Sequence, residues 1–307
     1  EGISAWISVM RGCDKFCTFC VVPFTRGRER SRSLESIVAE VENLAAHNFR
    51  EITLLGQNVN SYRSDGHDFA ELLAAVADVD DRIRIRYTTS HPQDMSDKLI
   101  ETMASRANIC NYIHLPVQSG SNRVLRLMNR TYTVEHYRER IAKIRELIPD
   151  VSLSTDIIAG FPTETEDDHR QTLELIERVA YDGAFTFKYS PRENTKAWAM
   201  GDGVSEETKS RRLAEIITVC RRTSESNNQR HVGIVEEVLV DGPSKKDASE
   251  WRGRTDTNKT VIFRHADEQI GDFVNVKIQR ASAATLYGST VDAEGIAKFI
   301  PLEMAIA

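Results

Sequence analysis

Three cysteines near the start of the chain are the residues most able to carry chemistry. Cys13, Cys17 and Cys20 lie within eight residues of one another, in the stretch RGCDKFCTFC. Cysteine thiolates bind zinc and iron–sulfur clusters, and a closed tetrahedral zinc site or cubane cluster takes four protein ligands. The sequence therefore predicts a metal centre that is one thiolate short of being closed.

Zinc, a redox dithiol and inert thiols each explain these cysteines less well than an iron–sulfur cluster. Structural zinc needs a second cysteine pair or histidines, and the nearest histidine, His47, falls in a predicted helix. Cys17 and Cys20 have the CxxC spacing of a redox dithiol, but Cys13 then has no role. Three inert thiols do not suit a loop punctuated by glycine. A four-iron cluster uses all three thiolates and leaves one iron open to a ligand.

Six short β-rich runs, alternating with helical patterns, must position these cysteines. Strands are predicted at residues 5–9, 51–55, 82–88, 112–115, 151–158 and 184–189. Apolar spacing predicts helices between them, and Thr163 with Glu166 predicts a capping box for the helix that carries Leu173 and Ile176. Six units are too few for a closed eight-stranded barrel. The chain is therefore predicted to be an α/β protein with an open partial (βα)6 barrel, and the cysteines follow its first strand.

The last third of the chain has a different pattern. A helix is predicted over residues 205–228, with Leu213, Ile216, Ile217 and Cys220 on its buried face. The runs VGIVEEVLV, KTVIF, FVNVKI and TLYGSTV then predict a small antiparallel β-barrel of the kind that often binds oligonucleotides. We expect three parts, a barrel domain with its helix at 1–229, a β-barrel at 230–292 and a tail at 293–307.

Composition narrows the class of protein. The chain has 307 residues, of which 40% are hydrophobic and 28% charged, and its formal net charge is −6. This charge argues against bulk attraction to nucleic acid but permits a local basic track. No apolar run approaches the ~20 residues of a membrane helix, and clustered cysteines suit a reducing compartment, so a cytoplasmic protein without membrane contact is expected. The chain starts with Glu1-Gly2-Ile3, and from this start we expect a chain that lacks its natural beginning.

The cysteine spacing C-x3-C-x2-C after the first strand of a partial barrel resembles the radical S-adenosylmethionine (SAM) superfamily. Within it, the chain resembles the methylthiotransferases, through VVPFTRG, LLGQNVN, TTSHP, HLPVQSGS and GFP at residues 21–27, 54–60, 88–92, 114–121 and 160–162. The C-terminal β-barrel resembles the OB-like TRAM domain, an RNA-binding module of that family. The GQNVN run is similar to the corresponding run in the branch of the family that modifies tRNA. Where the family usually has GFPGET, this chain has GFPTET, with Thr163 in place of a glycine.

This resemblance implies an enzyme, a tRNA methylthiotransferase that replaces the C2 hydrogen of N6-isopentenyladenosine, next to the anticodon, by a methylthio group. An aromatic C–H has no usable acidity, so a cofactor must supply a radical. The implied cofactors are a [4Fe–4S] cluster with one open iron, SAM, and a second [4Fe–4S] cluster on an N-terminal domain that this chain lacks. The implied partners are isopentenylated tRNA and an electron donor such as flavodoxin or ferredoxin, and a monomer is expected.

The resemblance and the positions of the strand ends together assign the site residues. Cys13, Cys17 and Cys20 are the expected cluster ligands, and no catalytic side chain is expected beyond the cluster and SAM. SAM is expected to contact six residues near the ends of strands two, four and five, namely Gln57, Asn58, Gln118, Ser119, Asp156 and Gly160. The glycine is expected to let the backbone approach the adenine. Polar residues at strand ends also commonly cap the next helix.

RNA contacts are predicted in two places. An extended loop would turn Arg26, Arg28, Arg30 and Arg32 to one side, near the cluster. The alternative is a solvated loop whose arginines pair with Glu29 and nearby acids. In the β-barrel, the predicted basic patch consists of Lys245, Lys246, Trp251, Arg252, Arg254 and Lys259, with the tryptophan available for stacking.

Three other functions stay open. Two are methylthiotransferases with another substrate, either a ribosomal protein or threonylcarbamoyl-adenosine in tRNA. The third is a non-catalytic RNA-binding protein with a structural metal. Substrate assays separate the first two from the isopentenyladenosine enzyme. Iron content and SAM cleavage after anaerobic reconstitution separate the third.

Overall fold

The computed structural model describes residues 2–245, 247, 249–264 and 267–292. The chain divides into two compact units, one of Ser4–Thr223 and one that combines Glu1–Ile3 with Ser224–Ala307. We describe each unit by itself, and the predicted tail at 293–307 lies outside the described residues. Within the described part of the chain, no helix combines the length and the apolar character that a membrane span requires.

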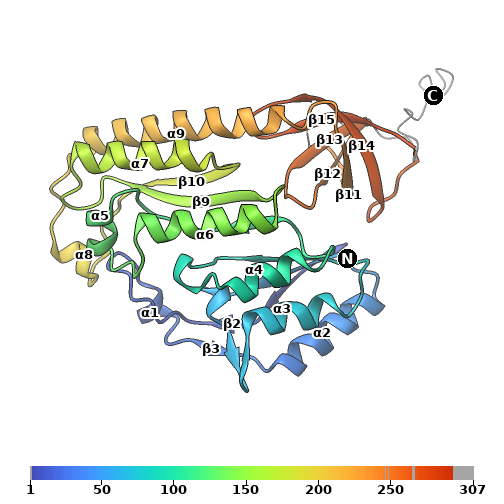
Figure 1. Cartoon of the computed structure of the whole chain (residues 1–307), viewed down its shortest axis with the longest axis horizontal. Helices are drawn as coiled ribbons and strands as arrows, with labels where there is room; N and C mark the ends of the chain where they lie inside the picture. The colour runs from blue at the N-terminus through green and yellow to red at the C-terminus, as the bar shows by residue number, and fades with distance from the viewer. Residues whose placement is uncertain (1, 246, 248, 265–266, 293–307) are drawn as a thin grey trace. The chain divides into compact units, whose positions relative to one another are not determined.

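The first unit carries six parallel strands in two three-stranded sheets (Figure 1). The first sheet has the order β1-β4-β7, with β1 at Ser4–Ser8, β4 at Glu51–Leu55 and β7 at Arg84–Thr88. The second has the order β10-β9-β8, with β8 at Tyr112–His114, β9 at Ser152–Ala159 and β10 at Gly183–Lys188. A parallel bridge between Ile85 and Ile109 connects the two. The strands follow one another in chain order, and the predicted open (βα)6 arrangement is confirmed.

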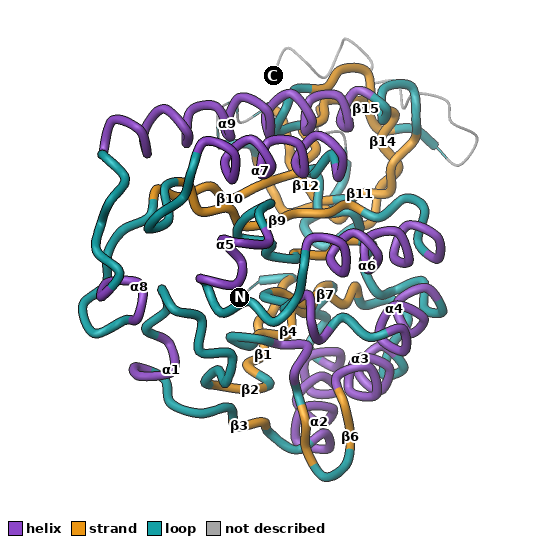
Figure 2. Tube along the Cα trace, turned by 60° about the vertical axis from the view of Figure 1, so that its left-hand side comes forward, coloured by secondary structure: helices purple, strands orange, loops and turns teal. Residues whose placement is uncertain are grey.

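Helices cover the outer side of these sheets (Figure 2). They are α2 at Leu34–Ala46, α3 at Phe69–Ala77, α4 at Asp97–Ala104, α6 at Val134–Leu147, α7 at Glu166–Val179 and the beginning of α9, which spans Glu206–Gln229. Ile52, Ile85, Ile113 and Ile157 of the strands are almost fully buried in one hydrophobic core with residues of these helices. Side chains alternate along a strand, so the intervening residues point to the opposite side. We call this second side the inner face; it includes Thr53, Arg86, His114, Asp156, Phe185 and Phe187.

Short elements complete the first unit. They are the helices α1 (Val22–Thr25), α5 (Asn122–Leu127) and α8 (Lys196–Ala199), the 3-10 turns η1 (Val59–Ser61) and η2 (Pro92–Asp94), and the two-residue strands β2 (Met10–Arg11), β3 (Arg30–Ser31), β5 (Arg63–Ser64) and β6 (His67–Asp68). β2 and β3 form an antiparallel pair on either side of the cysteine loop.

Two local predictions for the helices are wrong. The capping box of α7 consists of Thr165 and Asp168, two residues later than predicted. Thr163 cannot be the N-cap because its φ of +64° is left-handed, whereas an N-cap residue is extended. In α9, Ile217 is 47% exposed, since the buried stripe of that helix passes through Ile216 and Cys220 instead.

The second unit contains a closed five-stranded barrel. Its strands are β11 (Val235–Pro243), β12 (Glu250–Arg254), β13 (Thr260–Arg264), β14 (Phe273–Ala281) and β15 (Leu286–Thr290), in the order β11-β12-β13-β15-β14. All neighbours are antiparallel except β13 and β15. The sequence predicted four of these strands. It missed β12, whose residues EWRGR lack the alternating apolar side chains of the others.

Candidate active site

The three predicted cluster ligands lie on one loop between β2 and α1. Cys13, Cys17 and Cys20 are free thiols of intermediate exposure. Burial raises the pKa of Cys13 to about 11, and the negative potential of Glu29, Cys17 and Cys20 adds to the effect. Burial also raises the pKa of Cys20. The thiols therefore share one neighbourhood, and metal binding there must displace their protons.

The first half of the loop is held by the segment that ends at β3. The Cys13 N–H donates to the Gly27 carbonyl at 3.2 Å. Arg28 donates to both carboxylate oxygens of Asp14, at 2.5 and 3.1 Å. Gly12 has a φ of +82°, and a β-carbon there would stand 2.1 Å from the Arg28 carbonyl oxygen. Only glycine fits this close approach, so the backbone itself sets the position of the first cysteine.

The second half of the loop is held from α5 and α8. The Thr18 N–H donates to the Met128 carbonyl at 3.0 Å, and its hydroxyl donates to the Leu127 carbonyl at 2.8 Å. The Thr18 carbonyl accepts from the Ala197 N–H at 2.9 Å. The Asn129 amide donates to the carbonyl of Phe16 at 3.0 Å. Segments more than a hundred residues away in the chain thus fix the geometry of the CxxC turn.

Sequence reasoning missed Arg130, which places a buried charge beside the cysteines. Its side chain is 8% exposed, and Nη1 lies 3.4 Å from the Cys17 sulfur. Nη2 donates to the Pro116 carbonyl and Nε to the Tyr132 hydroxyl, both at 2.9 Å. These bonds hold the guanidinium in place, where its charge opposes the negative charge that a thiolate-bound cluster would carry. No sequence motif around residue 130 indicates this contact with Cys17.

The donor set fits an iron–sulfur cluster better than a single ion. Among the described residues, no three histidine, cysteine or acidic side chains converge on one point that a metal ion could occupy. Zinc needs such convergence. A four-iron cluster binds each cysteine through a different iron, so its thiolates stand further apart. Three thiols on one loop therefore suit a cluster whose fourth iron takes another ligand.

Gln57 and Asn58, predicted to contact SAM, are engaged in holding the cysteine loop. The Gln57 side-chain oxygen accepts from the Gly12 N–H at 2.6 Å. Asn58 is buried and donates to Asp94 at 2.8 Å. Asp94 in turn forms an ion pair of 2.6 Å with Lys15 of the loop. Both amides lie where the sequence placed them, at the rim, which is the edge of the first unit formed by the C-terminal ends of its parallel strands. Their side chains bond to other parts of the protein.

The predicted residues after strand four meet strand five through the backbone. Gln118 has a left-handed φ of +71°, and its N–H donates to the Asp156 carbonyl at 2.8 Å. Ser119 is buried, and its hydroxyl accepts from the N–H of Ser121, the N-cap of α5, at 3.2 Å. Ser121 itself caps α5, so this bond supports the turn before the helix and does not make Ser119 the cap. Asp156 points to the inner face, with Oδ1 3.4 Å from Nε2 of His114.

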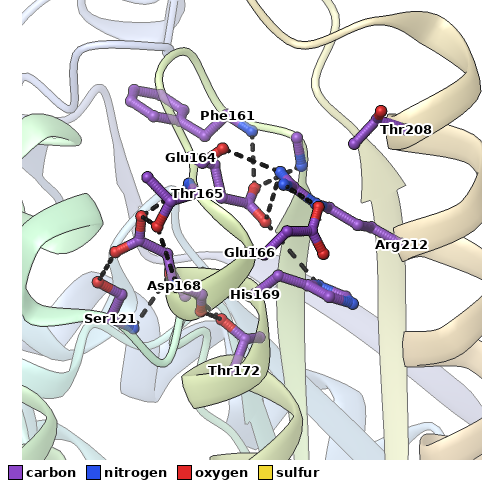
Figure 3. A network of polar contacts seen from close by, with 12 residues as sticks. Ser121, Phe161, Glu164, Thr165, Glu166, Asp168, His169, Thr172, Thr208 and Arg212 are labelled. Atoms are coloured by element: carbon purple, nitrogen blue, oxygen red, sulfur yellow. Dashed lines mark hydrogen bonds and ion pairs between the residues drawn. The ribbon is translucent and has the colours of Figure 1, made fainter.

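The turn after strand five is held by a buried carboxylate that sequence reasoning also missed (Figure 3). Glu164 accepts from the N–H groups of Gly160 and Phe161, at 2.5 and 3.0 Å. Burial raises the pKa of Glu164 to about 7, against the opposing effect of Arg212 at 3.5 Å. A β-carbon on Gly160 would stand 2.3 Å from Cγ of Lys209. The Lys209 stem therefore requires a glycine here, and the predicted approach of the SAM adenine to this backbone stays a prediction.

The four arginines of the predicted RNA loop do not lie on one extended strand. α1 and β3 interrupt the loop, and Arg26, Arg28 and Arg30 are exposed. Arg32 instead turns toward the body of the unit, donating to the Ser8 carbonyl at 3.2 Å and pairing with Glu40 at 2.7 Å. Arg28 and Arg32 thus have acidic partners, as the alternative expected, although Asp14 and Glu40 take the role assigned to Glu29.

The predicted basic patch of the second unit is smaller than the sequence suggested. Lys245 is exposed, whereas Lys246 lies outside the described residues. Trp251 packs against the barrel core but keeps intermediate exposure, whereas Lys259 is buried and offers no open contact surface. Arg252 and Arg254, both on β12, are half-buried. Arg254 donates to Asn258 at 2.9 Å. Lys245, Trp251 and the two arginines are the described members of the patch that reach solvent.

Sequence profiles match both units. The profile of the Radical SAM superfamily matches residues 7–176, and that of the TRAM domain matches residues 229–291. The chain therefore belongs to the radical SAM superfamily. This membership implies a [4Fe–4S] cluster and SAM as cofactors, for which Cys13, Cys17 and Cys20 supply the fitting donor set.

Curated relatives share the sequence of both units. A "tRNA-2-methylthio-N(6)-dimethylallyladenosine synthase" of Bacteroides fragilis is 53% identical over 295 residues, which cover 94% of this chain and 65% of the relative. A protein of the same name from Carboxydothermus hydrogenoformans is 50% identical over 293 residues, 94% of this chain and 67% of the relative. The chain thus spans about two thirds of the length of these relatives.

Solved structures share the fold. The coproporphyrinogen III oxidase HemN of Escherichia coli, described as a radical SAM enzyme, gives a TM-score of 0.55 at 16% identity and covers 92% of this chain and 68% of its own. The radical SAM methyltransferase TsrM of Kitasatospora setae gives 0.54 at 18% identity, over 64% of this chain and 39% of its own. At this identity the likeness is one of fold.

Proposed function

We propose that this chain is the SAM-binding and RNA-binding part of a tRNA methylthiotransferase. The proposed reaction replaces the C2 hydrogen of N6-isopentenyladenosine, next to the anticodon, with a methylthio group. The observation that carries the proposal is the 50–53% identity, over 94–95% of the chain, to proteins named for this reaction. The name's dimethylallyl group is the isopentenyl group of the predicted substrate.

The cysteine loop is the proposed cluster site. When bound, the cluster and SAM supply a radical able to break an unactivated aromatic C–H bond. Cys13, Cys17 and Cys20 would bind three irons, and Arg130 would balance part of the negative charge. Gln57 and Asn58 would keep the loop against the rim rather than contact SAM directly. The residues here hold and orient, which suits a reaction whose reactive group comes from the cofactor.

We place SAM at the rim formed by the ends of β8 and β9. The backbone of Gln118, the buried Ser119 and the turn at Gly160 are proposed to line this place. Glu164 already accepts from the N–H groups of that turn, so the turn would present SAM with a fixed backbone shape and not with these N–H groups. Water must be kept from this place because it would divert a reactive intermediate.

The remaining partners follow from the proposed reaction. Sulfur insertion would use the second [4Fe–4S] cluster expected on an N-terminal domain, and reduction would use flavodoxin or ferredoxin. RNA phosphates would be met by Arg26 and Arg30 near the cysteine loop and by Lys245 of the β-barrel, which are exposed. A monomer in the cytoplasm suits such a tRNA-modifying protein.

The first test concerns the cluster. Anaerobic reconstitution of the chain should give about four irons per chain and, on reduction, cleavage of SAM to 5′-deoxyadenosine. Replacing Cys13, Cys17 or Cys20 with serine should abolish both results. Cys110→Ser is the matched control, because this thiol is buried in the first unit away from the loop. Stable zinc binding without SAM cleavage would contradict the proposal.

The second test concerns the substrate. The chain joined to its N-terminal region should form the methylthio product on isopentenylated tRNA, as measured by mass spectrometry of the nucleosides. Unmodified tRNA, tRNA with threonylcarbamoyl-adenosine and a ribosomal-protein peptide are the comparison substrates. Product on any of these in preference to isopentenylated tRNA, or no product from an enzyme that cleaves SAM, would refute the proposed substrate.

A further inference from the structure

The inner face of the first unit carries large aromatic side chains that the core does not use. Phe185 and Phe187 of β10 are 58% and 50% exposed. The register pairs them with Asp156 and Ile158 of β9, so all four side chains point away from the helices. Two exposed phenylalanines, two residues apart on one face of a strand, form an apolar surface that indicates a ligand rather than a packing role.

A series of polar side chains, each in contact with the next, borders this aromatic surface. The ring of His114 meets that of Phe185 edge-on, with centroids 5.7 Å apart. Nδ1 of His114 lies 2.9 Å from the Ser154 hydroxyl, which is also 2.7 Å from the Tyr112 hydroxyl. On its other side, Nε2 of His114 lies 3.4 Å from Oδ1 of Asp156. These contacts fix the imidazole and the carboxylate beside the phenylalanine rings.

A flat aromatic ligand with a polar edge and an apolar substituent matches this arrangement. Proteins hold a base that has left the RNA stack between aromatic or apolar side chains, and read its edge with hydrogen bonds. Adenine with an isopentenyl group on N6 keeps one N6–H donor and ring acceptors, and adds a branched hydrocarbon. A carboxylate accepts from the N–H, and an imidazole N–H can donate to a ring nitrogen.

Resting on the proposed function, we propose that His114, Asp156, Phe185 and Phe187 form the subsite for the isopentenylated adenine. The ring stacks on Phe185, and the isopentenyl group packs on Phe187 beside Ile158. The polar edge meets His114 and Asp156. Asp156, which the sequence assigned to SAM, therefore belongs to the substrate. The subsite makes the enzyme prefer RNA that already carries the isopentenyl group.

Binding of two RNAs tests the subsite. The reconstituted chain is titrated with two labelled anticodon stem–loops that differ only in the isopentenyl group, and the ratio of their dissociation constants gives the preference. Phe187→Ala should lower the preference for the isopentenylated RNA about 10-fold relative to the wild-type chain. Phe185→Ala should weaken the binding of both RNAs by about 5- to 100-fold. Asp156→Asn should weaken the binding of both RNAs, because each base donates an N6–H and a neutral amide oxygen is a weaker acceptor than a carboxylate oxygen.

Ile217→Ala is the matched control, since this side chain is half-exposed on α9 and lies on the helical side of the unit. Cleavage of SAM in the absence of RNA is measured for every variant, and in Ile217→Ala it should equal that of the wild-type chain, which shows that the cluster and the fold are intact. If Phe185→Ala loses cluster absorbance or melts early, Phe185→Leu keeps an apolar side chain but removes the stacking ring. It should then show the same weaker binding.

The outcomes distinguish the subsite from the function on which it rests. If the wild-type chain cleaves SAM but binds the two RNAs with equal affinity, the proposed substrate is wrong. If it prefers the isopentenylated RNA and the phenylalanine variants keep that preference and affinity, the subsite is wrong while the function stands. If Asp156→Asn stops SAM cleavage without RNA, Asp156 is a SAM ligand and the assignment to the base is overturned.

Discussion

Replacing Gly12 with alanine should release the cysteine loop from the strand that holds it. The new β-carbon would stand 2.1 Å from the Arg28 carbonyl oxygen and 2.6 Å from that of Gly27. Both are backbone atoms, so no side-chain rotation can relieve the collision. To restore an ordinary contact, the backbone at Gly27 and Arg28 must move by about 1 Å relative to Gly12.

Two costs contribute to the expected loss of stability. Alanine in the left-handed conformation that Gly12 adopts, with φ at +82°, costs about 1–2 kcal/mol. The movement also weakens the hydrogen bond from Cys13 to Gly27 and the pairing of β2 with β3, each bond being worth about 0.5–1.5 kcal/mol. The sum is about 2–4 kcal/mol. For a unit of this size it should lower the melting temperature by roughly 4–16 °C.

Two other glycines isolate the collision from the conformational cost. Gly66 and Gly27 have φ values of +86° and +76°, and a β-carbon on either would meet nothing within 4 Å. Gly66→Ala and Gly27→Ala should therefore show only the first cost, about 1–2 kcal/mol. Melting is followed by circular dichroism of the metal-free chain, and iron is counted after reconstitution. If all three variants melt together, or Gly12→Ala binds iron as fully as Gly66→Ala, the close approach does not require the glycine.

Three further substitutions test single contacts. Arg130→Met removes a charge 3.4 Å from the Cys17 sulfur, so the cluster should reduce at a lower potential in a titration followed by electron paramagnetic resonance, with Arg130→Lys in between. Burial raises the pKa of Glu164 to about 7, above its unfolded value, so its charge costs stability as the pH rises through this range. Glu164→Gln should therefore gain on the order of 1–3 kcal/mol in urea unfolding at pH 8 and nothing at pH 5; equal pH slopes would contradict this. Thr163→Gly should stabilise by about 1 kcal/mol or less, because relief of the left-handed φ of +64° outweighs the lost 3.3 Å contact with Arg123; a clear loss would contradict it.

The strands and long helices could be predicted because their apolar residues repeat at short range. All six strands of the first unit lie within two residues of the predicted bounds. The predictions failed where one conformation decides among similar residue types. Thr163 and Thr165 both precede an acid by three residues, and only the backbone at each shows which caps α7. β12 was missed because its partners, rather than its own apolar pattern, make it a strand.

The candidate site divides in the same way. The cysteines were found because all three ligands lie within eight residues. Arg130 and Cys17 are 113 positions apart, and His114 and Ser154 are 40 apart, so no local spacing could join them. Glu164 lies in the GFPTET run, but that run does not indicate its role, which depends on accepting from the N–H groups of Gly160 and Phe161. The position of a polar residue at the rim could be predicted from the sequence, whereas its hydrogen-bond partner could not.

The rim and the inner face differ in what they present to a ligand. The rim has strained backbone, and the inner face has exposed side chains. Thr89, Gln118 and Thr163 follow β7, β8 and β9 with left-handed φ values of +70°, +71° and +64°. Non-glycine residues hold such angles at a cost, and this cost collects where loops must be shaped for a ligand. The inner face instead presents side chains, among them Phe185 and Phe187. A cofactor common to many enzymes can be held by backbone geometry, which tolerates sequence change. A particular base must be recognised by side chains, which can be exchanged without moving the strands, and substrate preference can therefore change while the cysteine loop stays the same.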